Sequence, residues 1–123
     1  MKHFLTAILI FLVSQIWGIN TIKTENDDNK SGRIRGIIID QTSGNPMEYA
    51  NIAVYSKSDS SLISGGITNQ KGEFEIKGMI PGEYYLEAHF IGFEKTSVKG
   101  IILDKQNSTF NSGNIKLAPH TLE

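Results

Sequence analysis

The sequence contains no cysteine, and this absence removes several classes of site at once. No disulfide, thiolate metal site or cysteine nucleophile can form. A lipoprotein anchor, which needs a cysteine at its cleavage point, is excluded as well. Histidine is scarce too: His3, His89 and His120 are scattered along the chain, whereas a zinc site needs three or four converging ligands. We therefore expect no metal and no cofactor.

An excess of positive charge is also lacking. The chain has 12 basic and 13 acidic residues, and its formal net charge is −1. Nucleic-acid binding depends on clustered Lys and Arg, and here Arg33 and Arg35 form the only close basic pair. We interpret this pair as part of a solvated strand face. Nucleic acid is therefore not an expected partner.

Only one long apolar run is present, from Phe4 to Trp17. It is short for a membrane span, which needs about 20 apolar residues. Lys2 supplies a positive start and Gly18 a small residue at the cleavage position, so residues 1–18 are predicted to be a signal peptide. An uncleaved anchor helix is the alternative. A leader without cysteines predicts export to the periplasm or outer membrane of a Gram-negative bacterium.

The remaining chain, to residue 123, has room for one domain. Residues 19–32 are polar and charged and cannot bury enough apolar surface to become ordered, so they are expected to form a flexible linker. The domain is expected over residues 33–118, and residues 119–123 form a C-terminal tail.

Helical periodicity is missing from this domain, and alternation of polar and apolar residues takes its place. Short alternating segments separated by turn residues predict an all-β fold, a seven-stranded antiparallel β-sandwich. The predicted strands are Arg33–Asp40, Ala50–Ser56, Leu62–Thr68, Glu73–Lys77, Glu83–Phe90, Glu94–Leu103 and Asn114–Ala118. The side chains predicted to face inward are Ile34, Ile38, Ala50, Ile52, Val54, Phe74, Ile76, Tyr84, Leu86, Ala88, Phe90, Val98, Ile115 and Leu117.

The connections between these strands carry their own signals. Asn69–Gly72 can close a hairpin, with Gly72 free to take a positive φ. Pro81 and Gly82 suit the central positions of a type II turn, with Gly82 in the left-handed region. Residues 104–112 are polar apart from one phenylalanine and are expected to form a loop. Outside the core, Ile37, Ile39 and Tyr55 are expected on an outer face that is available for contacts.

No catalytic set emerges from the residues. Serines gather at positions 56–64, but turns commonly contain serine, and no histidine lies near them in sequence. Four glutamates, Glu73, Glu75, Glu83 and Glu87, alternate with apolar residues and fit the wet faces of two strands. The glycines at Gly65 and Gly66 do not precede a helix, as a phosphate-binding loop requires. The chain is therefore expected not to be an enzyme, with no catalytic, cofactor-binding or metal-binding residues.

The spacing of glycine, proline and apolar residues resembles that of the carboxypeptidase regulatory-like domain, a family with a transthyretin-like fold. The resemblance covers roughly Arg33 to Leu117, and Asn69 departs from it, because the family usually has aspartate there. The matching positions are Gly36, Ile38, Asp40, Gly44, Pro46, Ala50, Ile52, Val54, Gly66, Thr68, Gly72, Phe74, Ile76, Ile80, Pro81, Gly82, Tyr84, Leu86, Ile91, Gly92 and Phe93.

The resemblance implies a non-catalytic accessory role. Such a domain occurs at the N-terminus of outer-membrane β-barrel proteins of the TonB-dependent receptor type, where a plug and a barrel follow it. This sequence contains neither, so only a periplasmic accessory role carries over, with an outer-membrane barrel or a periplasmic protein as partner. The alternative is a free-standing secreted module that binds a protein or a glycan. A purine-degradation hydrolase shares the transthyretin-like fold, but this chain ends His120-Thr121-Leu122-Glu123 and lacks its C-terminal tetrapeptide.

Overall fold

A computed structural model describes residues 31–121 of the chain. The expected signal peptide and nearly all of the expected linker lie outside the described residues. Seven strands make up the described part, and it contains no helix: β1 (Gly32–Asp40), β2 (Asn51–Ser56), β3 (Leu62–Ile67), β4 (Glu73–Met79), β5 (Gly82–His89), β6 (Thr96–Leu103) and β7 (Thr109–Leu117). Residues 31–121 accordingly contain no helix that could cross a membrane.

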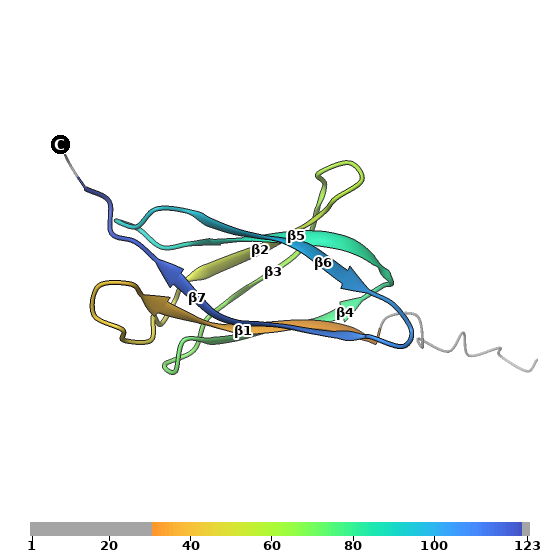
Figure 1. The fold of residues 1–123 in the computed structure, drawn as a ribbon, viewed down its shortest axis with the longest axis horizontal. Helices are drawn as coiled ribbons and strands as arrows, with labels where there is room; N and C mark the ends of the chain where they lie inside the picture. Colours follow the sequence, from red (N-terminus) through yellow and green to blue (C-terminus); the bar gives the residue numbers. More distant parts are fainter. Residues whose placement is uncertain (1–30, 122–123) are drawn as a thin grey trace, which may run out of the picture.

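The strands form two sheets that face one another, as Figure 1 shows. The three-stranded sheet has the order β4-β1-β7, and the four-stranded sheet has the order β3-β2-β5-β6. This confirms the expected β-sandwich of seven strands. The pairing differs from the expectation at one place, because β7 runs parallel to β1 while every other pair is antiparallel. Alternation has the same period in both kinds of pair, so it could not reveal this.

The turn at residues 69–72 forms as expected, but its strands do not pair. Asn69 Oδ1 accepts hydrogen bonds from the backbone N–H groups of Lys71 and Glu73, both at 3.0 Å. Gly72 has a φ of 71°, which the missing side chain permits. The turn carries the chain from β3 in one sheet to β4 in the other. The expected hairpin is therefore wrong, and the turn instead joins the two layers.

The predicted type II turn at Pro81–Gly82 is also wrong. Gly82 is not among the described glycines with positive φ, and it is the first residue of β5. The chain crosses between the sheets at Ile80 and Pro81 instead. The glycine of this stretch that takes a positive φ is Gly78, at 72°, inside β4.

Gly78 is one of three strand glycines with a positive φ that lie at β-bulges. Gly78 in β4, Gly100 in β6 and Gly113 in β7 have φ values of 72°, 74° and 66°. At each of them the strand gains one residue relative to its neighbour, and the register shifts. Such a β-bulge changes which side chains beyond it face the core. The alternation therefore reverses within each of these three strands.

This reversal explains most of the core residues that the sequence analysis missed. Met79 follows Gly78, and Ile101 and Leu103 follow Gly100; all three are buried, with at most 2 % exposed. The strand β7 also begins earlier than the predicted Asn114, because Thr109 to Asn111 pair with β1 before the bulge at Gly113. The stretch expected to be a loop up to residue 112 is thus partly strand.

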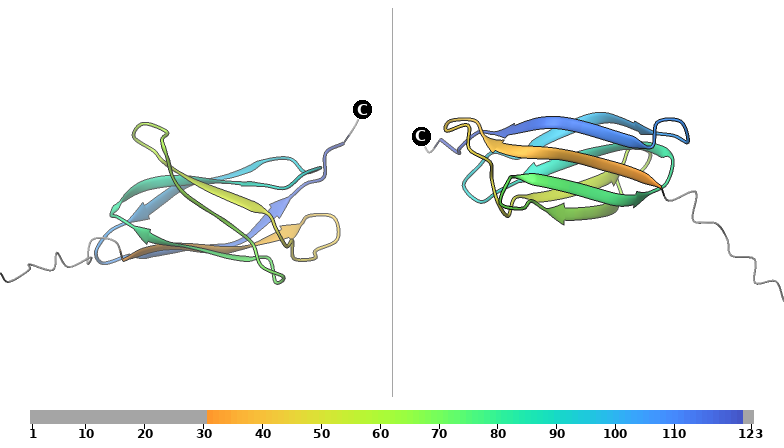
Figure 2. Two further views of the ribbon diagram at one scale, coloured as in Figure 1. Left: turned by 180° about the vertical axis from the view of Figure 1, so that it is seen from behind. Right: turned by 90° about the horizontal axis from the view of Figure 1, so that it is seen from below.

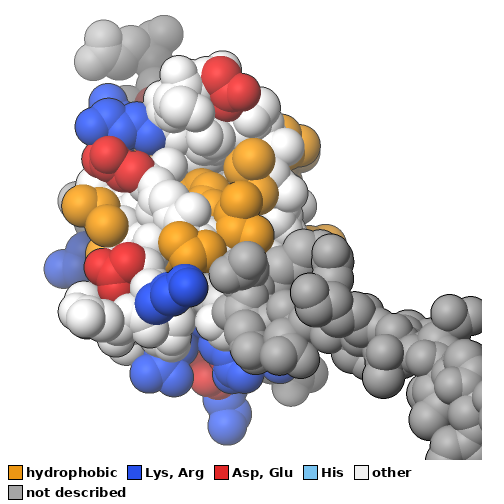
Figure 3. Space-filling view, turned by 90° about the vertical axis from the view of Figure 1, so that its right-hand side faces the viewer, with side chains coloured by type: hydrophobic (Ala, Val, Ile, Leu, Met, Phe, Trp, Pro, Cys, Tyr) orange, Lys and Arg blue, Asp and Glu red, His pale blue; other side chains and the backbone are white. Residues whose placement is uncertain are grey.

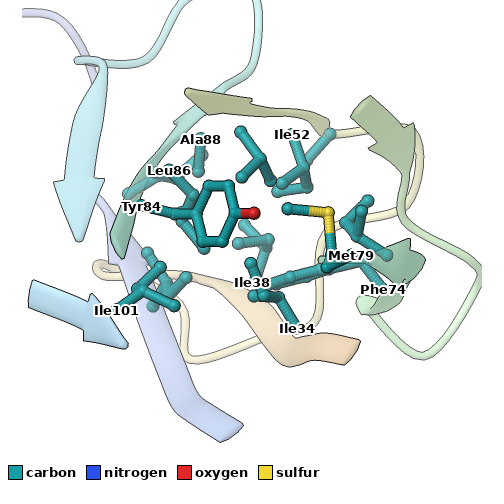
Figure 4. Packing of buried hydrophobic residues seen from close by; sticks show 14 of the residues in the cluster. Ile34, Ile38, Ile52, Phe74, Met79, Tyr84, Leu86, Ala88 and Ile101 are labelled. Carbon is teal, nitrogen blue, oxygen red and sulfur yellow. The ribbon is translucent and has the colours of Figure 1, made fainter. Parts of the chain in front are cut away.

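The core lies between the two sheets (Figure 4). Twelve of the fourteen predicted inward side chains are buried, whereas Phe90 and Val98 are only partly buried against the core. Tyr84 points into the core, and its hydroxyl donates a hydrogen bond to the backbone oxygen of Ile80 at 2.6 Å. Thr68, the one buried polar residue of the described part, donates to the Met47 backbone oxygen and accepts from the Ala50 N–H at 2.8 Å. Every buried side-chain nitrogen and oxygen of the described residues therefore has a hydrogen-bond partner.

Candidate interaction surfaces

His89 and His120 are the histidines of the described residues, and they do not form a site together; His3 lies outside the described residues. His89 is exposed at the end of β5, on the polar side expected for it. His120 Nδ1 lies 2.8 Å from a carboxylate oxygen of Glu94 at the surface. Residues 31–121 contain no group of three His, Asp or Glu side chains that could hold a metal.

The four strand glutamates lie on two different sheets, Glu73 and Glu75 on β4 and Glu83 and Glu87 on β5. Three of them contact lysine or arginine side chains. Glu75 lies 3.5 Å from Arg33 and 3.4 Å from Lys77, Glu83 lies 2.9 Å from Lys57, and Glu87 lies 3.3 Å from Lys95. They form the solvated faces that alternation predicted.

The loop serines close a turn. Asp59 Oδ1 accepts hydrogen bonds from the Ser61 hydroxyl at 2.7 Å and from the Ser61 backbone N–H at 3.0 Å. These bonds lower the pKa of Asp59 below its ordinary value. Ser56 and Ser58 share a hydroxyl–hydroxyl bond of 2.9 Å. Each contact stays within the loop, as turn chemistry predicts.

The single outer face expected for Ile37, Ile39 and Tyr55 does not exist. Ile37 and Ile39 point away from the core on β1 of the three-stranded sheet, while Tyr55 does so on β2 of the four-stranded sheet. They therefore lie on opposite sides of the sandwich. Tyr55 stacks instead on Tyr85 of β5, with ring centroids 5.1 Å apart and an interplanar angle of 16°.

The hollows at the surface of residues 31–121 include two that are lined mainly by residues of the strands. One, of about 560 Å³, is lined by residues that include Arg35, Ile37, Glu73 and Asn111. The other, of about 500 Å³, lies at the end where β4 passes into β5 and is lined in part by Ile63, Ile80 and Pro81. Figure 3 shows apolar side chains gathered at this end of the molecule.

Comparison with known families gives the context for this scaffold. The sequence model of the carboxypeptidase regulatory-like domain matches residues 33–118. The chain belongs to this family. No curated protein matches the chain. Two glycines that carried the resemblance lie where this regulatory-like domain has no room for a side chain. A Cβ on Gly36 would lie 2.9 Å from the Phe74 ring, and a Cβ on Gly72 would lie 2.5 Å from the Ile38 backbone oxygen.

Solved structures share the fold of this regulatory-like domain at low identity. The 5-hydroxyisourate hydrolase of Klebsiella pneumoniae has a TM-score of 0.57 at 16% identity, with 73% of this chain and 93% of that chain covered. The major pilin subunit of Bacillus cereus has a TM-score of 0.54 at 16% identity, with 72% of this chain covered. The pilus 2b backbone protein of group B streptococcus has a TM-score of 0.52 at 15% identity, with 74% of this chain covered. The chain spans only 30% and 42% of those two pilus proteins.

Proposed function

We propose that the chain is a non-catalytic accessory domain on the periplasmic side of the outer membrane, similar to the N-terminal extension of a TonB-dependent receptor. The observation that supports this proposal is that residues matching the family have roles in folding. Gly36 and Gly72 sit where a side chain would collide, and Phe74 and Leu86 are buried in the core. A chain whose matching positions serve its scaffold in this way is suited to docking or spacing.

The ionisable groups support the same proposal. An active site requires groups that converge on one point with perturbed pKa values. The hydrogen bonds that lower the pKa of Asp59 stay within its own loop. The pKa of Tyr84 is raised because it is buried, but its hydroxyl is bonded to a backbone oxygen. Tyr84 lines the second hollow together with Glu83 and Lys57, but its hydroxyl is engaged by the Ile80 oxygen, and Asp59 lines neither of the two hollows.

A free-standing secreted module that binds a protein or a glycan is the second candidate. The observation that favours it is the Tyr55–Tyr85 stack on the outer side of the four-stranded sheet. Aromatic side chains with a polar tip are frequent in binding surfaces. Sequencing the gene beyond codon 123 separates the two candidates. A plug and barrel supports the first, and a stop codon with no barrel gene nearby supports the second.

The accessory role is tested by expressing the full chain in a Gram-negative host and fractionating the cells. We expect protein in the periplasm or outer membrane that has lost about 18 N-terminal residues. We also expect the same melting temperature with and without a chelator, and no turnover in a broad hydrolase screen. Intact Met1 in a soluble cytoplasmic pool would contradict export. Turnover that His89→Ala abolishes would contradict the non-catalytic role.

A further inference from the structure

The first and last strands of the sandwich are direct neighbours and run in the same direction. Arg33, near the start of β1, lies opposite Thr109, the first residue of β7. Asp40, at the end of β1, lies opposite Leu117, the last residue of β7. Figure 2 shows the two strands side by side in the three-stranded sheet. Because the pair is parallel, β1 starts and β7 finishes at opposite ends of the molecule, as Figure 1 shows.

Hydrogen bonds reach from one end of this pair to the other. At one end the Arg33 N–H donates to the Ser108 oxygen at 2.7 Å, and at the other the Gln41 N–H donates to the Leu117 oxygen at 2.9 Å. The bulge at Gly113 divides the ladder into a part of three register pairs and a part of four. The bonds of a ladder run between the strands, so a pull along the strands acts on many of them together.

We propose that the domain is a spacer that bears tension between its two ends. Tension on the chain before β1 and after β7 pulls the two strands past one another, so several hydrogen bonds must break before either strand moves. In an antiparallel pair the same two ends would lie together, and tension would peel the strands apart one bond at a time. This inference goes beyond the proposed function, because it requires neither export nor a particular partner.

The neighbours of the two strands make their mutual pair the route of the force. β1 is the central strand of its sheet and is also held by β4 on its other side. β7 is an edge strand, and within its sheet it pairs with β1 alone. Ile38 of β1 and Ile115 of β7 lie opposite one another and are 0% and 5% exposed. Sliding of β7 along β1 would therefore break the ladder and expose apolar surface at the same time.

The residues that follow β7 hold its end against the sandwich. The Glu94 N–H donates to the Ala118 oxygen at 2.8 Å, and the His120 N–H donates to the Gly92 oxygen at 2.9 Å. A carboxylate oxygen of Glu94 also lies 2.8 Å from His120 Nδ1. These contacts oppose lifting of the end of β7 away from β1. Tension therefore reaches β7 along the direction of the strand.

Single-molecule stretching of the full chain tests the proposal, because the chain has no natural cysteine and two introduced cysteines define the direction of pull. Handles at Ser31→Cys and Thr121→Cys pull β1 and β7 past one another. Handles at Ser31→Cys and Asn107→Cys pull at one end of the pair and peel it. At equal pulling speed we expect the first geometry to need about twice the force or more, because several bonds resist together. An equal or lower force in the first geometry overturns the proposal.

Matched core substitutions locate the resistance. Ile115 lies under the β1–β7 pair, whereas Ile52 lies on β2 in the other sheet, and the two are 5% and 3% exposed. Ile115→Val and Ile52→Val remove the same methyl group, so we expect melting curves that show two folded variants with similar losses of melting temperature. With handles at residues 31 and 121, Ile115→Val should lower the unfolding force more than Ile52→Val does. An equal loss of force in both variants would place the resistance outside the β1–β7 pair and overturn the proposal.

Discussion

Replacing Gly100 with alanine isolates the energetic cost of one bulge. Gly100 has a φ of 74°, and a Cβ added there would meet no atom within 4 Å. The substitution therefore costs only the left-handed backbone torsion, about 1–2 kcal/mol for a residue with a side chain. For a domain of this size, this corresponds to a fall in melting temperature of about 4–16 °C. Lys99→Ala, at the exposed neighbouring position, should stay within about 0.5 kcal/mol.

Deleting Gly100 tests what the bulge does for the core. Without the extra residue, plain alternation would turn Ile101 and Leu103 outward, although they are 0% and 2% exposed in the sandwich. Losing the burial of both costs about 3–6 kcal/mol, a large share of the stability of a small domain. Urea unfolding followed by circular dichroism measures both changes. If Gly100→Ala is neutral, or if the deletion is tolerated as well as the substitution, the bulge does not set the orientation of these side chains.

Two further predictions concern β5. Leu86 is fully buried, so Leu86→Ala should cost about 2–5 kcal/mol, whereas Glu87→Ala, on the other face, should cost no more than about 1 kcal/mol; equal losses in urea unfolding would mean that the faces are reversed. Tyr84→Phe should cost about 0.5–1.5 kcal/mol through the lost bond to Ile80. Burial raises the pKa of Tyr84, so its contribution is present below about pH 10 and is lost as the pH rises through the folded-state pKa. Tyr84→Phe should therefore reduce the alkaline loss of stability, and an unchanged pH profile would contradict this.

The sequence predicted strands well where alternation runs unbroken between turns. β2 and β5 begin and end within one residue of their predicted bounds, and their inward residues, such as Leu86, are buried. β7 was half missed, because its first five residues contain a single large apolar side chain, Phe110. Thr109 to Asn111 pair with β1, and the bulge follows them. Composition alone cannot distinguish such a segment from a loop.

The arrangement of the strands was less predictable than the strands themselves. Alternation states that a strand has two faces, but it does not assign the strand to a sheet. For this reason Ile37 and Tyr55 were expected on one face and lie on opposite sides.

A glycine inside a predicted strand can also be interpreted in two ways. Gly100 could be read as a weak point in β6, and only the register with β5 identifies it as a bulge.

The edge strands of the two sheets differ in how much they contribute to the core. The bulged edge strands β4, β6 and β7 all contribute buried side chains, so charges placed on their inner faces would unfold the sandwich. β3 contributes none, and its inward positions include Ser64 and Gly66. Ile67 is 62% exposed, so Ile67→Lys should leave the melting temperature close to that of the unchanged chain. A fall as large as that of Leu86→Ala would show that Ile67 contributes to folding in spite of its exposure.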